Sequence, residues 1–258
     1  MPSPAKTPIL PHSLPLTLIV ATTPIRVASP AANEPPTRLG IGLKGTLPWP
    51  RIKTDMSFFA RATSRSPAPG TTNAIIMGRK TYDSVPPHLR PLGKRISVVV
   101  TRDTTGTVRD GVLQELAARK AKMAAKSADE PEADALVAGS LDAALAELDS
   151  TYGAAGRLGK VFVIGGAEIY GAALRMQQVV RPVRIVMTNV VRKAEGEGEA
   201  REFECDTFFP VEKLTAKDGW RTASPEELSE WVGESVSGEW IREGDVEVQM
   251  VGYERVSS

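Results

Sequence analysis

The sequence predicts an α/β fold: a single domain with a predominantly parallel central sheet flanked by helices, and an antiparallel C-terminal hairpin. Short, almost wholly apolar runs recur along the chain, as is typical of strands that are covered on both faces. Longer segments between them have helical periodicity. Most of these runs end at a glycine or at a hydroxyl beside a basic residue, so we expect ligands beyond the carboxyl ends of the strands.

Composition narrows the possible functions. The 258 residues carry a net charge of +1, which gives no case for a nucleic-acid partner or an anionic membrane. No apolar run is long enough to span a bilayer. The single cysteine, Cys205, excludes an internal disulfide and fits a reducing, cytoplasmic location. Two histidines give poor support for a histidine-rich metal site, and we expect no metal. We expect residues 1–13 to form a Pro-rich arm and residues 14–258 to form one monomeric domain.

The first buried strand is expected at Leu16–Ala21. Thr23–Arg38 contains four prolines and is expected to be a surface loop. The next stretch, Leu39–Phe59, begins as a glycine-spaced loop and turns through Leu47–Pro50. It then becomes helical, because proline suits the first turn of a helix.

An acid lies on the apolar face of that helix. Ile52, Met56 and Phe59 are spaced along one face, and Asp55 lies on the same face. A carboxylate there loses hydration, so its neutral form becomes easier to populate. A lone aspartate on a helix is more often a cap or the partner of a nearby base. Trp49 just upstream, together with phosphate-binding elements further on, favours a functional acid here.

Two strand ends are suited to phosphate groups. The strand Ala74–Met77 runs into Gly78-Arg79-Lys80-Thr81, where free amides and the helix dipole favour an anion, although an exposed basic turn is the simpler alternative. The strand within Arg95–Arg102 ends at Thr101 and Arg102, which could hold a second phosphate. Phosphates at two places suggest a dinucleotide with a 2′-phosphate. Just before that strand, Arg90–Arg95 offers a cation suited to a carboxylate.

The remaining elements follow in order. Gln114–Ser127 is expected to be a solvated helix, with Arg119, Lys120, Lys122 and Lys126 on its wet face and not in a binding patch. Ser140 is expected to cap a helix. The strand Lys160–Ile164 ends at Gly165-Gly166, a pair that permits close approach of a ligand. The pair is not the G-x-G-x-x-G fingerprint, and no acid follows about twenty residues later, which disfavours an NAD-type Rossmann domain and favours NADPH.

The C-terminal segments complete the sheet. Arg184–Val191 is expected to be a strand, and a turn is expected at Glu243–Asp245. After that turn Val246, Val248 and Met250 alternate with polar residues, which predicts an antiparallel strand with one wet face.

Seven motifs in order carry a family resemblance. They are I-V-A at 19–21, G-I-G with L-P-W at 40–49, the acid Asp55, I-M-G-R-K-T-Y at 76–82, R-P-L-G-K-R at 90–95, V-I-G-G-A-E-I-Y at 163–170 and D-T-F-F-P at 206–210. Together they resemble the dihydrofolate reductase family, from Leu16 to Val256. The long Thr23–Arg38 and Gln114–Asp134 segments resemble its expanded fungal branch more than the compact bacterial one.

The resemblance implies NADPH-dependent reduction of 7,8-dihydrofolate to 5,6,7,8-tetrahydrofolate, with hydride transfer to C6 and protonation at N5. It implies that Asp55 binds the pterin amino group and N3 and raises the proton affinity of N5, supported by Thr188 through a water. Leu47 and Trp49 would close the site and position that water. Antifolate inhibitors are expected to bind at the same place.

The resemblance also implies the binding residues. The substrate residues would be Ile19, Val20, Asp55, Met56, Phe59, Val85, Leu92, Arg95, Ile164 and Tyr170, with Arg95 pairing with the glutamate α-carboxylate. The cofactor residues would be Ala21, Ile41, Gly45, Thr46, Gly78, Arg79, Lys80, Thr81, Thr101, Arg102, Gly165, Gly166, Ala167, Glu168 and Ile169. The Gly165–Gly166 peptide bond is expected to be cis. Met56 stands where many members have an aromatic residue.

Two alternatives remain open. A pyrimidine reductase of riboflavin synthesis shares this fold and cofactor, but it would not need Asp55 beside a tryptophan or Arg95 for a glutamyl tail. A non-catalytic NADP-binding module would give no reason to retain Asp55 on an apolar face.

Overall fold

The computed structural model describes residues 14–26, 37–124, 133–176, 181–193, 201–211 and 213–256. The expected Pro-rich arm lies outside these residues. Within the described part, no helix combines the length and the apolarity that crossing a membrane requires.

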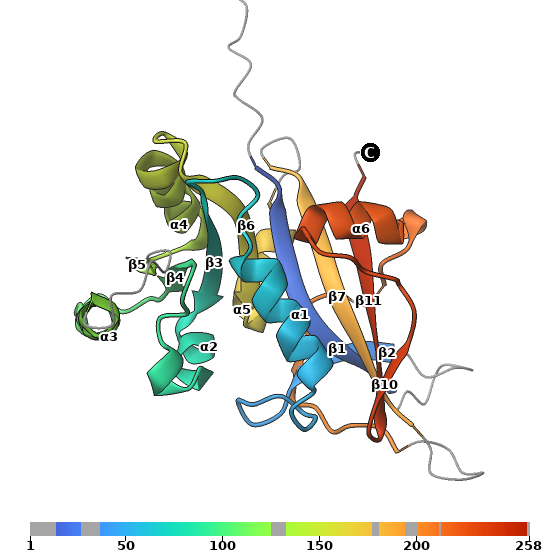
Figure 1. Cartoon of the computed structure of the whole chain (residues 1–258). Coiled ribbons are helices and arrows are strands. Elements are labelled where there is room, and N and C mark those ends of the chain that lie inside the picture. Colours follow the sequence, from blue (N-terminus) through green and yellow to red (C-terminus); the bar gives the residue numbers. More distant parts are fainter. Residues whose placement is uncertain are drawn as a thin grey trace, which may run out of the picture.

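A single sheet runs through the molecule (Figure 1). Its main strands are β1 (Leu16–Arg26), β3 (Thr72–Gly78), β4 (Ile96–Val100), β5 (Asp134–Ala138), β6 (Leu158–Gly165), β7 (Val183–Arg192), β10 (Ile241–Glu243) and β11 (Val246–Arg255). Their order is β10-β11-β7-β1-β6-β3-β4-β5. In this spatial order, each strand from β7 through β1, β6, β3 and β4 to β5 is parallel to its neighbour. β11 is antiparallel to both β7 and β10. The predicted fold class is therefore confirmed.

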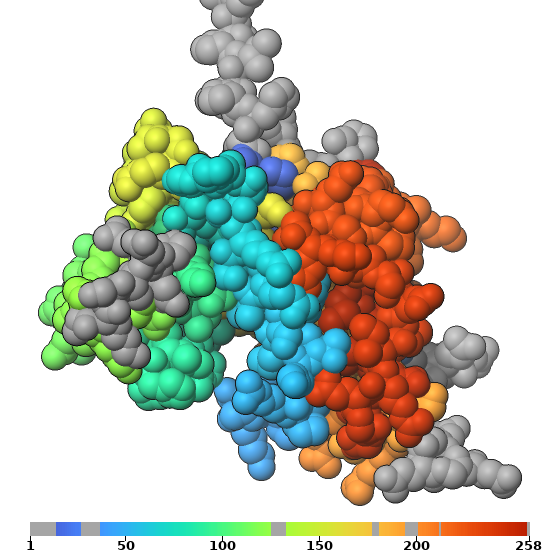
Figure 2. Space-filling view, viewed as in Figure 1, coloured from blue at the N-terminus to red at the C-terminus, as the bar shows by residue number. Residues whose placement is uncertain are grey.

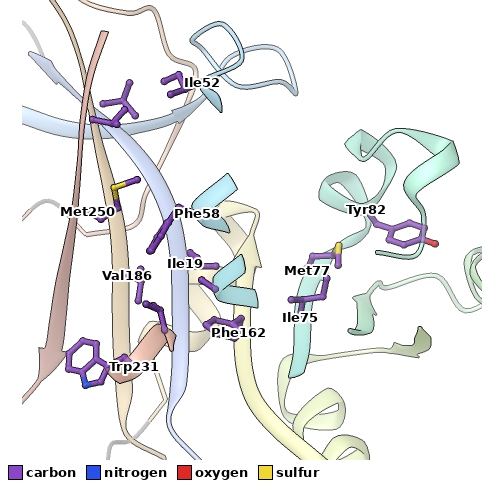
Figure 3. Packing of buried hydrophobic residues seen from close by; sticks show 14 of the residues in the cluster. Ile19, Ile52, Phe58, Ile75, Met77, Tyr82, Phe162, Val186, Trp231 and Met250 are labelled. Carbon is purple, nitrogen blue, oxygen red and sulfur yellow. The ribbon is translucent and has the colours of Figure 1, made fainter. Parts of the chain in front are cut away.

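Helices cover both faces of this sheet. The helices are α1 (Lys53–Ser64), α2 (Arg79–Ser84), α3 (Thr107–Ala124), α4 (Leu141–Leu148), α5 (Ala167–Leu174) and α6 (Pro225–Val232). One apolar layer joins α1, α3 and α6 to the sheet through residues such as Phe58, Leu116 and Trp231. The other layer joins α4 and α5 to the opposite face. Figure 3 shows Phe58 of α1 directed onto the strands close to Ile19, so α1 is held firmly on the sheet.

The expected surface loop at Thr23–Arg38 is wrong at both ends. Thr23–Arg26 continues β1, and Thr37–Gly42 forms β2, so that Thr23 lies opposite Gly40 and Arg26 opposite Thr37. Among the described residues, β1 pairs only with β2 at Pro24, so proline is tolerated there because one side of the strand needs no N–H donor. Residues 27–36 lie outside the described part of the chain.

The glycine-spaced stretch after it is likewise a strand and not a loop. β2 pairs with the short strand β8 (Thr207–Phe208), and a Cβ added at Gly40 would overlap the side chain of Cys205. The chain then turns tightly at Lys44 and Gly45, which both have positive φ, and Leu43 and Thr46 exchange two backbone hydrogen bonds of 2.9 and 3.0 Å. The glycines therefore permit close strand packing before the turn.

The helix that carries Asp55 begins at Lys53 and not at Pro50, so that part of the prediction is also wrong. Ile52 occupies the N-cap position and has no side-chain acceptor to offer. Acceptors come instead from Glu243, whose carboxylate receives the amides of Lys53 and Thr54 at 2.6 and 2.8 Å. The C-terminal hairpin therefore decides where α1 starts.

Other elements extend beyond the prediction. α3 begins at Thr107, seven residues before the expected start. The strand β9 (Trp220–Thr222) and α6 were not predicted, although Ser224 and Glu227 form a capping box just before an apolar run. The predicted alternation at Val246, Val248 and Met250 is confirmed, because all three side chains are buried.

Candidate active site

A cavity of about 2250 Å³ lies along the carboxyl ends of β1, β3, β4 and β6. Every candidate site residue from the sequence lines it, from Leu47, Trp49 and Asp55 to the glycine pair and the basic strand ends. Figure 2 shows an open hollow between the light-blue segment that precedes α1 and the green segment of α2. The residues of the sequence motifs therefore line one cavity. Their individual roles remain predictions.

Asp55 lies in the first turn of α1 and is only 5% exposed. Its helical neighbour Phe58 packs into the core, whereas Met56 and Phe59 remain partly buried and line the cavity. The predicted apolar face is therefore divided: one side rests on the sheet, and the adjacent side faces the cavity. Asp55 lies where the two sides meet.

Burial raises the pKa of the Asp55 carboxyl, and the negative charge of Glu243 raises it further. The hydroxyl of Thr188 opposes this shift, because its hydrogen bond to the carboxylate stabilises the charged form. Thr188 lies on the central strand β7, opposite Ala21 of β1, so its position is rigid.

Trp49 lines the same cavity as Asp55 and is 5% exposed, and its ring packs edge-on to that of Phe203 with 5.9 Å between the ring centroids. Its buried indole Nε1 has no hydrogen-bond acceptor among the described residues. A buried donor without an acceptor is unfavourable, so this N–H is suited to an acceptor brought by a bound molecule. Leu47, by contrast, is exposed at the edge of the cavity.

Arg95 provides a buried cation elsewhere in the cavity. Its guanidinium donates to the Thr63 hydroxyl at 2.7 Å and to the Gly93 carbonyl at 2.9 Å. No carboxylate among the described residues pairs with it. Burial lowers the pKa of Arg95 to about 10, and the nearby charge of Arg119 adds to this effect. A fixed guanidinium with unused donors is suited to a carboxylate of the ligand.

Apolar side chains line the cavity together with Asp55 and Arg95. They are Ile19, Val20, Met56, Phe59, Val85, Leu92, Ile164 and Tyr170. Tyr170 is fixed by a 2.7 Å hydrogen bond from its hydroxyl to the Ile19 carbonyl. An acid, an apolar surface and a cation in one cavity suit an elongated molecule with a polar head, aromatic rings and an acidic tail.

The ends of β3 and β6 approach each other closely. Met77 lies opposite Gly165, and a Cβ at Gly78 would be 3.3 Å from Ile169 and 3.9 Å from the Gly166 nitrogen. The Gly165–Gly166 peptide bond is cis, as expected. Small residues at both strand ends leave backbone amides accessible to a phosphate.

The basic residues at this end are solvent-exposed. Arg79 pairs with Asp83 at 3.2 Å, and Arg102 pairs with Glu168 at 3.5 Å. Exposed pairs of this kind contribute little to stability, so a phosphate can displace the carboxylates. These cations, with Lys80 and Thr101, therefore fit a phosphorylated dinucleotide.

Some cavity residues were missed or misassigned in the sequence. Gly139 and Ser140 lie directly after β5 and line the cavity, although Ser140 was predicted only as a helix cap. It does cap α4, accepting from the Ala143 amide at 3.1 Å. A glycine and a serine after a parallel strand were a signal that could have found this site. Arg119 was expected on a wet face, but it also lines the cavity.

Comparison with known proteins decides the family. The family model described as dihydrofolate reductase matches residues 36–230 of this chain. The chain belongs to the dihydrofolate reductase family. A dihydrofolate reductase of Pneumocystis carinii is 33% identical over 245 residues, which cover 91% of this chain and 95% of that protein.

Two further relatives agree with this assignment. A dihydrofolate reductase of Schizosaccharomyces pombe is 35% identical over 86% of this chain, although the match spans only 41% of that longer protein. The solved structure of Schistosoma mansoni dihydrofolate reductase has a TM-score of 0.59 and 26% identity, covering 95% of this chain and 100% of that one. The dihydrofolate reductase fold therefore extends over nearly the whole chain.

Proposed function

We propose that this chain reduces 7,8-dihydrofolate to 5,6,7,8-tetrahydrofolate with NADPH. The observation that carries the proposal is a buried acid, Asp55, in the same cavity as a buried cation, Arg95, that lacks a carboxylate partner. Dihydrofolate has a pterin head with donor groups, two ring systems and a glutamate tail. Its chemistry matches the acid, the apolar lining and the cation.

Asp55 binds and polarises the pterin. Its carboxylate oxygens accept from the pterin amino group and N3, and its negative charge raises the proton affinity of N5. Because Asp55 is buried, its charge is weakly screened by solvent. Thr188 keeps the carboxylate oriented, and the Trp49 indole N–H, which has no acceptor among the described residues, is available to an acceptor of the bound substrate or water.

NADPH supplies the hydride for C6 when it is bound, and solvent supplies the proton for N5. The residues present fit this cofactor, because Gly78 and Gly166 leave room for the pyrophosphate and because two cation-bearing strand ends lie in the same cavity. Arg79, Lys80, Thr81, Thr101 and Arg102 would hold the phosphates. Ala21, Ile41, Gly45 and Thr46 would lie along the nicotinamide ribose.

The test is the loss of NADPH absorbance when the protein meets dihydrofolate. Asp55→Asn is expected to lower kcat by about 100-fold or more, because general acid–base groups contribute at least that much. The matched control is Asp110→Asn on α3, which makes the same chemical change at an exposed residue outside the cavity.

Two outcomes would contradict the proposal. A wild-type protein that binds NADPH but does not reduce dihydrofolate would redirect the assay to pyrimidine substrates or to the non-catalytic alternative. An Asp55→Asn protein as active as Asp110→Asn would remove Asp55 from the reaction. Neither alternative function has an observation in its favour.

A further inference from the structure

Arg119 brings a second guanidinium to the part of the cavity around Arg95, where the glutamate tail of the substrate is proposed to bind. It projects from α3, which the sequence predicted to be a solvated helix, and it is partly buried against the segment that carries Arg95. A Cβ added at Gly93 would overlap the Arg119 Nη2 atom and lie 3.3 Å from its Cζ. The absence of a side chain at Gly93 therefore lets the guanidinium rest on the backbone two residues before Arg95.

No acid among the described residues neutralises Arg119. Glu115 lies one helical turn earlier, but it accepts from the Tyr82 hydroxyl at 2.6 Å and pairs with Arg90 at 3.5 Å. The only hydrogen bond found for Arg119 among the described residues is a long one of 3.5 Å to the Leu89 carbonyl. Its guanidinium donors therefore remain available to a ligand.

Two guanidinium groups held close together repel each other unless an anion lies between or beside them. The charge of Arg119 is strong enough at Arg95 to contribute to the lowered pKa there. Lys94, which is exposed and also lines the cavity, adds a third positive charge. Arg95 is the more deeply buried of the two arginines, so Arg119 lies further toward solvent along the same cavity.

We infer that Arg119 forms a second carboxylate subsite, which takes a carboxylate of an additional γ-linked glutamyl residue on the substrate tail. This inference rests on the proposed function and deepens it. Arg95 holds the α-carboxylate of the first glutamate, and the tail leaves the cavity past Gly93. The preferred substrates are then dihydrofolates with more than one glutamyl residue.

The experiment compares KM values for dihydrofolate and for its γ-linked diglutamate form. The wild type is expected to have a lower KM for the diglutamate. The ratio to follow is the KM for dihydrofolate divided by the KM for the diglutamate. Arg119→Met keeps most of the apolar stem and removes the charge. It is expected to reduce this ratio by about fivefold, as a partly exposed charge-assisted pair predicts. Raising the salt to 0.5 M should move the wild-type ratio toward that of the variant, because the pair is screened.

The matched control is Lys122→Met, which removes one positive charge from an exposed position on the same helix outside the cavity. It is expected to keep the wild-type ratio. Gly93→Ala displaces the guanidinium without deleting it and should reduce the ratio in the same direction. Thermal melting of each variant verifies that it is folded.

An unchanged ratio in a folded Arg119→Met protein overturns this inference and leaves the proposed function intact. Reduction of neither substrate by the wild type overturns the proposed function, and the inference with it. A ratio that falls equally in Lys122→Met would assign the effect to net charge and would also overturn the subsite.

Discussion

The contact between Glu243 and the start of α1 gives the sharpest structural prediction. Glu243 lies at the end of β10, and its two carboxylate oxygens receive the backbone amides of Lys53 and Thr54 at 2.6 and 2.8 Å. Ile52, at the N-cap position, makes no side-chain hydrogen bond. The next residue of the helix after Thr54 is Asp55, so the hairpin fixes the turn that presents the acid.

The size of the effect follows from the two hydrogen bonds. Losing a side-chain cap costs about 1 to 2 kcal/mol, and losing a negative charge at a helix N-terminus costs about 0.5 kcal/mol more. We therefore expect Glu243→Ala to lower the free energy of unfolding by about 2 kcal/mol. For a protein of this size, that corresponds to a fall in Tm of about 4 to 8 °C. Glu243→Gln keeps one acceptor and should cost about half as much.

The pH dependence has a definite sign. The hydrogen bonds from Thr54 and Lys53 lower the pKa of Glu243 below its usual 4.5. Its stabilising contribution is therefore present above that value and is lost as the pH falls through the lowered pKa. The difference in Tm between the wild type and Glu243→Ala should be full at pH 7 and should disappear in strong acid.

Two measurements identify the mechanism. Hydrogen exchange should accelerate at the amides of Lys53 and Thr54 in Glu243→Ala. The Asp55 carboxyl, followed by its ¹³C chemical shift, should titrate at lower pH in Glu243→Gln, because the charge that helps to raise its pKa has gone.

The control for this prediction is Glu247→Gln on the same hairpin, where Glu247 pairs with Lys193 at 2.9 Å and makes no hydrogen bond or ion pair with α1 in the described part of the chain. It is expected to leave the Asp55 titration and the exchange of the two amides unchanged. Unaltered amide exchange in a folded Glu243→Ala protein would refute the reasoning, because the hairpin would then not hold the start of α1.

Three further predictions concern other parts of the molecule. Asp55→Asn should raise Tm at pH 8, because a carboxylate whose pKa is raised by burial destabilises the fold as the pH rises through that pKa. The gain in Tm should shrink toward pH 4. A gain in Tm that grows in acid would contradict the raised pKa. Arg95→Met should raise the KM for dihydrofolate by about tenfold or more, since a hydrogen bond to a charged group contributes about 1.5 to 3 kcal/mol. Steady-state kinetics measure this change. An unchanged KM in a folded variant would exclude Arg95 from binding the glutamate tail. Ser224→Ala should lower Tm by about 2 to 4 °C, because it removes the capping box of α6, and Ser237→Ala in the following loop provides the comparison.

The sequence predicted the centre of the sheet well, because its strands are covered on both faces. A run such as Ala74–Met77 has no polar residue to obscure its period, and Gly78 marks where it ends. The same rule failed for Thr23–Arg26, because prolines argue against a strand and nothing local reveals that one side of this strand needs no donor.

The candidate site was predictable where its residues cluster in the chain, and not where they meet only through the fold. Asp55 and Trp49 are six residues apart, but Glu243 contacts α1 across 190 residues and had no local signal. Arg119 was misassigned for a related reason. The helical periodicity of α3 shows which of its residues can be exposed. It does not show that the absence of a side chain at Gly93 leaves room for the Arg119 guanidinium.

These two long-range contacts indicate how elements outside the seven motifs can act on the site. Each supplies one charged side chain to a segment that carries a candidate site residue: Glu243 to the turn before Asp55, and Arg119 to the backbone before Arg95. Deleting either element would therefore remove a charge as well as apolar packing. Point substitutions at Glu243 and Arg119 separate these contributions, because they keep the hairpin and α3 in place. If truncation of α3 impaired the diglutamate substrate more than Arg119→Met does, then the packing of the helix would matter for the tail as well as its charge.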